Sequence, residues 1–243
     1  MLAHAACAAL ILRFVYPRVT AARRRVLMRW WSAKLLRILN VTPVATGIPP
    51  GGDAGVMIAA NHVAWLDIFL VSSVRPTRFV AKSEIRDWPI AGWIAERAGT
   101  LFIRRDQMRD MARIDAKVRA ALAQGDCVGL FPEGITTEGD TLRKFHSSLF
   151  EPAVANGAPV HPVAIRYEHL DGTLCRAASF VGEVTFMQSM GLIIRQRAML
   201  ARICFAAPLE TQEATRRDAA RRGARGPMHH RYPSRTGRPA QLA

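Results

Sequence analysis

Short apolar runs alternate with helix-forming segments through the middle of the chain. The runs have the composition of buried strands and lie at residues 56–60, 78–82, 100–103, 127–131, 159–166 and 198–205. Segments typical of helices separate them, at residues 65–73, 89–98, 106–124, 146–156 and 191–196. Strands that alternate with helices indicate an α/β fold whose largely parallel sheet is flanked by helices.

The N-terminal part of the chain has a different pattern. Residues 2–12 are apolar, but this run ends well short of the roughly 20 residues that a membrane-spanning helix needs. Residues 18–40 combine arginines, leucines and two adjacent tryptophans, as in a helix that lies at a membrane surface. An ordinary surface helix packed on its own domain is the alternative. We expect membrane-associating helices within residues 1–41, and a short, tilted span that continues through residues 14–16 stays open.

Two segments lack apolar periodicity. Residues 42–55 hold three prolines and four glycines, which predicts a connector. From residue 213 onward the chain is rich in Arg, Gly and Pro, which predicts a disordered basic tail. The chain then divides into N-terminal helices (1–41), an α/β domain (42–210) and the tail (211–243).

The charge of the chain is strongly basic. It carries 34 Lys and Arg residues against 19 Asp and Glu residues, a formal net charge of +15. Such an excess favours an anionic partner such as a phosphate-bearing substrate, anionic lipid headgroups or nucleic acid, although a solvated surface and tail would account for part of it. The four cysteines have neither a C-x-x-C pair nor a metal-ligand spacing, so we expect reduced core residues and no metal site.

The turn after the apolar run 56–60 contains His62 and, five residues later, Asp67. An imidazole and a carboxylate that orients it can remove the proton from a poor nucleophile such as an alcohol. A histidine with a purely structural role is the alternative. Glu133 follows another predicted strand, and ligands of parallel sheets bind outside the carboxyl ends of strands, so the two turns could converge.

Four spaced motifs occur in order along the chain. They are Asn61-His62-x4-Asp67, the stretch Gly-Thr-Leu-Phe-Ile-Arg-Arg at residues 99–105, Phe131-Pro132-Glu133-Gly134, and Val160-His161-Pro162-Val163-Ala164. Together they resemble the glycerolipid acyltransferase family, typified by bacterial 1-acyl-glycerol-3-phosphate acyltransferases, over about residues 40–210. The ordered set is far more specific than any one motif.

This resemblance implies that His62 is the general base and that Asp67 orients it. His62 would take a proton as the acceptor oxygen attacks an acyl thioester, and would then pass that proton to the departing thiolate. On a continuous helix, five residues separate two side chains by about 140°. The two side chains can therefore meet only if the chain turns between them or if Asp67 stands at the start of a helix.

The resemblance also assigns substrate-binding positions. Arg105 would bind the phosphate of the acceptor, Glu133 and Gly134 would serve acceptor binding, and Pro162 with its neighbours would lie on the acyl-donor side. Where the family commonly has Thr or Ser after Glu-Gly, this chain has Ile135, so a hydroxyl contact is lost or shifts to Thr136 or Thr137. Some members carry an arginine at the position of Thr136, and its absence places more of the phosphate binding on Arg104, Arg105 and Lys82.

The implied activity is that of an O-acyltransferase at the cytoplasmic face of the bacterial inner membrane. We expect acyl transfer to the free hydroxyl of 1-acyl-glycerol-3-phosphate, giving phosphatidate, with another lysolipid such as lyso-ornithine lipid as the alternative acceptor. The partners would be an anionic membrane surface, the lysolipid, and an acyl-carrier protein or coenzyme A thioester, with no cofactor and no nucleic acid. A non-catalytic basic protein that binds anionic membranes or nucleic acid is the alternative of another class.

Overall fold

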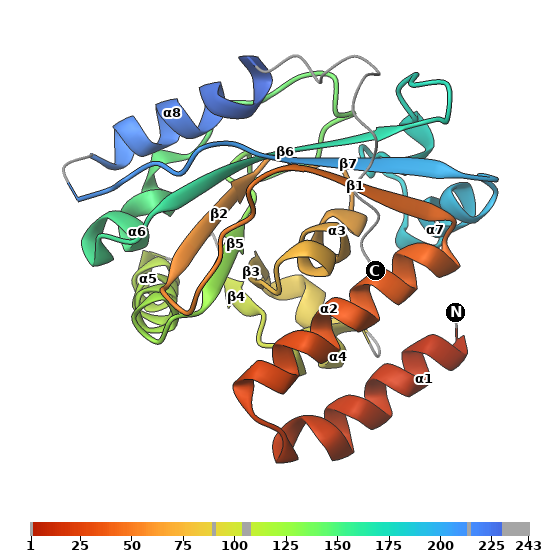
Figure 1. Ribbon diagram of the computed structural model, residues 1–243, viewed down its shortest axis with the longest axis horizontal. Coiled ribbons are helices and arrows are strands. Elements are labelled where there is room, and N and C mark those ends of the chain that lie inside the picture. The colour runs from red at the N-terminus through yellow and green to blue at the C-terminus, as the bar shows by residue number, and fades with distance from the viewer. Residues whose placement is uncertain (1, 89–90, 104–107, 213–214, 230–243) are drawn as a thin grey trace.

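A seven-stranded sheet runs through the centre of the molecule in the computed structural model, which describes residues 2–88, 91–103, 108–212 and 215–229 (Figure 1). The strand order across the sheet is β1-β7-β6-β2-β5-β3-β4. The strands are β1 (Val41–Gly47), β2 (Val56–Ala60), β3 (Arg78–Lys82), β4 (Leu101–Ile103), β5 (Cys127–Leu130), β6 (Val160–Glu168) and β7 (Met199–Phe205).

Most of the sheet is parallel. The neighbours β6, β2, β5, β3 and β4 all run the same way, whereas β7 is antiparallel to β6 and β1 follows the direction of β7. The prediction of a largely parallel α/β sheet is therefore confirmed. Because β2 and β5 are adjacent and parallel, the turns that hold His62 and Glu133 leave the sheet at the same edge.

Helices cover both faces of the sheet (Figure 1). The helices are α1 (Leu2–Leu10), α2 (Ala21–Ile38), α3 (Leu66–Val74), α4 (Ala91–Arg97), α5 (Met108–Ala123), α6 (Glu151–Asn156), α7 (Phe186–Ile194) and α8 (Arg216–His229), with short helical turns at Ile11–Val15, Tyr16–Arg18, Ser83–Asp87, Ser147–Phe150 and Arg176–Ala178. One apolar cluster packs α2, α3 and α7 on the sheet, and a second packs α5, α6 and α8 on the other face. Along β2, Val56 and Ile58 belong to the first cluster while Met57 and Ala59 belong to the second, so this strand is buried on both faces.

The N-terminal helices α1 and α2 lie side by side on the α3 side of the sheet (Figure 1). The ring of His4 on α1 stacks on Trp31 of α2 with centroids 4.7 Å apart, and Trp31 meets the edge of Phe69 on α3 at 5.5 Å. The two helices are therefore attached to the domain through aromatic contacts. Within the described ranges, every helix is too short or too polar to cross a bilayer. Their association with a membrane stays a prediction.

One segment predicted to be a connector is a strand. Residues 42–55 contain most of β1, which pairs with β7 alone and so forms an edge of the sheet. Proline has no backbone N–H and cannot donate a hydrogen bond to a neighbouring strand. In an edge strand one side has no neighbouring strand, so proline is tolerated there. Pro43 therefore does not prevent β1 from forming, although the prolines of this segment favoured the prediction of a connector.

The predicted disordered tail is also partly folded, because α8 begins at Arg216. Its start is capped by Thr215 and Asp218, whose side chains each accept a hydrogen bond from the other's backbone N–H at 3.3 Å. Ala219 and Ala220 are buried in the same cluster as Phe150. The buried face of α8 consists of small side chains, and arginines surround them in the sequence. The sequence of this helix therefore shows only a weak alternation of hydrophobic and polar positions, although the helix packs on the domain. The prediction of disorder is wrong for this helix.

Candidate active site

The side chains of His62 and Asp67 meet at the carboxyl end of β2. His62 Nδ1 lies 2.8 Å from Asp67 Oδ2. The Asp67 side chain is fully buried, whereas that of His62 is 21% exposed. Since a carboxylate can only accept hydrogen bonds, Nδ1 carries a hydrogen and donates this hydrogen bond to Asp67 Oδ2. His62 Nε2 then holds the free lone pair of the ring, and it has no hydrogen-bond partner within the described chain.

The chain turns between these two residues. Residues 61–64 are not helical, α3 begins at Leu66, and Asp67 therefore lies in the first turn of the helix. The backbone N–H groups of Val63 and Ala64 donate to Asp67 Oδ2 at 2.8 and 3.0 Å. Both conditions set by the five-residue spacing are therefore met, because the chain turns between the two residues and Asp67 stands at the start of a helix.

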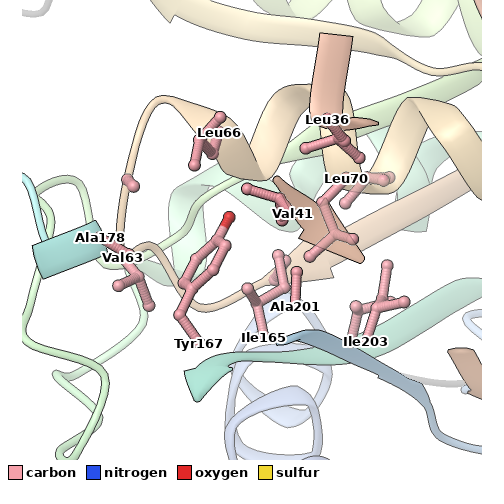
Figure 2. Close-up of a cluster of buried hydrophobic side chains, with 14 of the residues drawn as sticks. Leu36, Val41, Val63, Leu66, Leu70, Ile165, Tyr167, Ala178, Ala201 and Ile203 are labelled. Atoms are coloured by element: carbon pink, nitrogen blue, oxygen red, sulfur yellow. The ribbon is translucent and has the colours of Figure 1, made fainter. Parts of the chain in front are cut away.

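A tyrosine completes the shell of hydrogen bonds around Asp67. The hydroxyl of Tyr167 donates to Asp67 Oδ1 at 2.7 Å. Figure 2 shows Tyr167 standing up from β6 among Val63, Leu66 and Ile165, with its oxygen at the far end of the ring. Burial raises the pKa of Tyr167 well above its usual range, so the phenol stays a proton donor. The position of the carboxylate is thus determined by four donors.

Glu133 holds the backbone of the histidine turn. Its Oε1 accepts a hydrogen bond from the N–H of His62 at 2.9 Å, and its Oε2 accepts one from the N–H of Arg143 at 2.8 Å. The residue is 4% exposed, and burial raises the pKa of its carboxyl group against the opposing effect of these two donors. Glu133 therefore links the histidine turn to two points of the loop that follows β5, and both of its oxygens are occupied by backbone groups.

The turn after β5 also supports the imidazole. Phe131 stacks under the ring of His62 with centroids 3.9 Å apart and an interplanar angle of 9°. Gly134 has φ of +78°, a left-handed conformation that favours glycine. The N–H of Thr137 donates to the carbonyl of His62 at 2.8 Å. The hydroxyl of Thr136 donates to the carbonyl of Phe180, so both threonines hold loops together.

The other residues assigned from the sequence occupy several positions. Lys82 is exposed at the carboxyl end of β3 and pairs in register with Ile103 at the end of β4. Arg104 and Arg105 come next in the chain and lie outside the described residues. Pro162 is buried inside the sheet opposite Ala59 and has no hydrogen bond to the histidine turn. Its role on the acyl-donor side, and the role of Glu133 and Gly134 in acceptor binding, stay predictions.

Two further residues shape the site although the motifs gave them no role. Asn61 pairs with the backbone of Ile165, accepting from its N–H at 2.7 Å and donating to its carbonyl at 3.0 Å. This pair continues the contact between β2 and β6 past the last residue of the strand. Tyr167 is the other one. Alternate residues of a strand face the same side, so Tyr167 shares the face of Ile165 and Val163. All three belong to the apolar cluster that contains the start of α3, and this alternation is the signal that could have placed Tyr167 there.

The assembled site can perform general base catalysis. Nδ1 is bound to a fixed carboxylate, the ring is held by a stacked phenylalanine, and Nε2 is the basic atom that remains. Such a base removes a proton from a hydroxyl group placed beside it, which contributes roughly 10²–10⁴-fold to a rate. In a serine hydrolase the base would need a nucleophilic serine, but the chain has no G-x-S-x-G motif.

Comparisons with known proteins show which family the chain resembles. The model of a family described as Acyltransferase matches residues 40–166. The chain is 38% identical to the lyso-ornithine lipid O-acyltransferase of Pseudomonas aeruginosa over 203 residues, which are 84% of this chain and 77% of that protein. It is 37% identical to the 1-acyl-sn-glycerol-3-phosphate acyltransferase of Neisseria meningitidis over 170 residues, 70% of this chain and 66% of that protein.

The fold also matches a solved structure. The crystal structure of the 1-acyl-sn-glycerophosphate (LPA) acyltransferase PlsC from Thermotoga maritima has a TM-score of 0.62 and 20% sequence identity, and the match covers 91% of this chain and 90% of that one. At this identity the likeness concerns the fold, and the family model with the Pseudomonas aeruginosa relative carries the family assignment.

Proposed function

The chain belongs to the acyltransferase family, and we propose that it moves a fatty acyl group from an acyl thioester to the free hydroxyl of 1-acyl-glycerol-3-phosphate, giving phosphatidate. The observation that carries this proposal is the 2.8 Å contact between His62 Nδ1 and Asp67 Oδ2 at the carboxyl end of β2. It supplies an oriented imidazole where a parallel sheet places its ligands.

In the proposed reaction, His62 Nε2 accepts the proton of the lysolipid hydroxyl as its oxygen attacks the thioester carbonyl. The resulting tetrahedral intermediate collapses, the carbon–sulfur bond breaks, and the imidazolium returns the proton to the thiolate. The products are an ester and a free thiol. Asp67 stabilises the imidazolium while it exists. No covalent bond to the enzyme forms, and the donor is an acyl-carrier protein or coenzyme A thioester.

The acceptor's anionic group would bind beside this base. Lys82 is at the same edge of the sheet as His62, and Arg104 and Arg105 follow β4 in sequence. A guanidinium binds two oxygens of a phosphate at once, which makes arginine suited to this role. Glu133 contributes to this site by holding the backbone of His62.

A second acceptor is favoured by a specific observation. The alignment with the lyso-ornithine lipid enzyme extends over 84% of this chain, against 70% for the glycerolipid relative, at nearly equal identity. Ornithine offers a carboxylate where lysophosphatidate offers a phosphate, and an arginine fork binds either group. Lyso-ornithine lipid is therefore the second candidate.

We also propose that α1 and α2 bind an anionic membrane at the cytoplasmic face of the inner membrane. Exposed apolar side chains support this proposal: Phe14, in the helical turn after α1, is 54% exposed, and Val26 and Trp30 on α2 are 67% and 48% exposed. Sedimentation with phosphatidylglycerol vesicles tests it, because Trp30→Ala should weaken binding while Ile48→Ala, on a connector outside these helices, should not. Equal binding by the two variants would remove the support.

The function is tested by thiol release from purified protein with acyl-carrier protein and coenzyme A donors and a panel of lysolipid acceptors. Lysophosphatidate-dependent thiol release, with phosphatidate as the product, is the expected result. Release only with lyso-ornithine lipid would replace the first acceptor by the second. No release with any pair of donor and acceptor would overturn the proposal.

A further inference from the structure

A cavity of about 300 Å³ lies at the opposite end of the sheet from His62. Arg78 and Cys127, the first residues of β3 and β5, line it, whereas His62 and Glu133 follow the other ends of β2 and β5. The four residues of β5 separate the two places by about 13 Å at roughly 3.3 Å per residue. The cavity is therefore distinct from the acyl-transfer site.

Arginines dominate its lining. The cavity is lined by Arg24, Arg25, Arg75, Arg78 and Arg97, against the single carboxylate of Asp126. They come from the start of α2, the segment that leads into β3, and the end of α4, so the fold brings separate segments to one point. Guanidinium groups gathered in this way repel one another unless an anion lies between them.

The existing contacts leave much of this charge unmatched. Arg78 Nη1 donates to Asp126 Oδ2 at 2.6 Å, so this carboxylate is already engaged. Arg25 donates to Asp53 at 2.9 Å, outside the lining. Arg24 donates through Nε to the carbonyl of Tyr16 at 2.9 Å, and its guanidinium lies 5.3 Å above the Tyr16 ring. The terminal nitrogens of Arg24 have no hydrogen bond within the described residues.

Arg75 gives the second, independent sign of a missing ligand. Its Nη2 donates to the carbonyl of Gly52 at 2.9 Å. Its Nε is buried and has no hydrogen bond of normal geometry in the part of the chain that the structure describes, although the guanidinium also interacts with the thiol of Cys127. Buried polar groups are nearly always paired, because leaving one unpaired costs its full desolvation. Because Nε is covered by the protein, a ligand in the cavity would contact the Nη groups of Arg75, and Nε would be paired only if the side chain turned toward the ligand.

We propose that this cavity binds a phosphate-bearing ligand, held by Arg24, Arg75 and Arg97. Phosphate suits the site because each guanidinium offers a planar fork of donors to its oxygens. The phosphate comes from a lipid headgroup or from a soluble phosphate ester. The first source is favoured by Phe14 and Val15, which precede Tyr16 and are 54% and 40% exposed. A bilayer that accepts these two side chains would bring headgroups to the cavity.

Two double variants with the same loss of charge test the proposal. Arg24→Gln with Arg75→Gln removes two guanidinium groups from the lining. Arg23→Gln with Arg37→Gln removes two that are exposed on α2 and lie outside it. Both double variants keep Lys82, Arg104 and Arg105. Any phosphate bound by these three residues contributes equally to both binding measurements. Binding is measured calorimetrically with inorganic phosphate at constant ionic strength, and by sedimentation with phosphatidylcholine vesicles with and without phosphatidic acid.

We expect the cavity variant to bind its ligand about tenfold more weakly than the matched control, or weaker still. A selective loss for phosphatidic acid vesicles identifies a headgroup as the source, and a selective loss for inorganic phosphate alone identifies a soluble ester. Equal weakening in both double variants, or no binding by the parent protein to either probe, overturns the proposal. If the cavity variant unfolds, the single variants Arg24→Gln and Arg23→Gln are compared in the same binding assays, with the same expected difference. These readouts involve no acyl transfer, so their failure leaves the proposed function standing.

Discussion

The two ends of the parallel strands hold their charged side chains in opposite ways. At the carboxyl end, Asp67 and Glu133 are 0% and 4% exposed, and each of their four carboxylate oxygens accepts a hydrogen bond from the protein. At the amino end, five arginines face one carboxylate around a cavity, and Arg75 Nε has no hydrogen bond of normal geometry in the described chain. At the carboxyl end the protein itself supplies every hydrogen bond to the two carboxylates. At the amino end the arginines have more hydrogen-bond donors than the protein has acceptors for them.

This difference separates two kinds of functional site. A catalytic group must be held rigidly before the substrate arrives, so its supporting hydrogen bonds are made within the protein. A binding site for an ion must keep donors for its ligand. Substitutions at the carboxyl end should therefore damage catalysis or stability, and substitutions at the amino end should leave the ligand-free fold nearly unchanged.

The largest effect is expected for Asp67→Asn. The amide oxygen can take the place of Oδ2 and keep the donors Val63 N–H and Ala64 N–H, but the charge that stabilises the imidazolium is lost. Turnover in the thiol-release assay should fall by about 10²–10⁴-fold with the fold intact. The control is Asp171→Asn, at an exposed position. Similar turnover in both variants would contradict the role given to Asp67.

Glu133→Ala should cause the largest loss of stability. It leaves the N–H groups of His62 and Arg143, both partly buried, without the acceptor that holds their two loop segments together. The free energy of unfolding in urea should fall by about 2–5 kcal/mol, whereas Glu183→Ala, in an exposed loop, should change it by less than about 0.5 kcal/mol. Equal values for the two variants would show that Glu133 does not hold the turn.

Tyr167→Phe should have an intermediate effect. The variant keeps the ring in the core but removes the only donor to Asp67 Oδ1 that the described residues supply. The free energy of unfolding should fall by about 1–3 kcal/mol. Turnover should fall far less than in Asp67→Asn because Val63 and Ala64 still hold the other oxygen. A loss of turnover as large as that of Asp67→Asn would mean that Tyr167 acts in the reaction itself.

The smallest effect is expected at the amino end. Arg75→Gln removes a buried unpaired N–H together with one hydrogen bond to the carbonyl of Gly52. These two changes oppose each other, so the free energy of unfolding in phosphate-free buffer should change by less than about 1 kcal/mol. A loss as large as that of Glu133→Ala would show that the arginine is structural and would erase the difference between the two ends.

The fold was largely predictable because its central strands are buried on both faces. Such strands are continuous apolar runs, and the run at residues 56–60 coincides with β2. An edge strand such as β1 has no such signal, since it contains Pro43 and is only partly buried. Helix α8 was missed because its buried face consists of alanines such as Ala219 among arginines.

The site was predictable where its residues share one turn, as His62 and Asp67 do, or follow neighbouring parallel strands, as His62 and Glu133 do. His62 and Asp67 share one turn, so their spacing could be tested against the geometry of a helix start. Tyr167 reaches Asp67 from 100 positions away, and the fold alone brings them together. The same holds for the arginine cavity, whose lining residues come from separate segments. Patterns along the chain describe burial and the ends of strands, but they do not state which side chains of distant strands and loops meet.

The central claim is that His62 is the base for acyl transfer to a lysolipid. It is tested most directly by thiol release with lysophosphatidate and lyso-ornithine lipid, comparing His62→Ala with His146→Ala, a matched change at an exposed histidine. We expect the first variant to lose about 10²–10⁴-fold in turnover with both acceptors or with whichever one the parent protein uses. The second should retain the activity of the parent. Undiminished turnover in folded His62→Ala would contradict the claim.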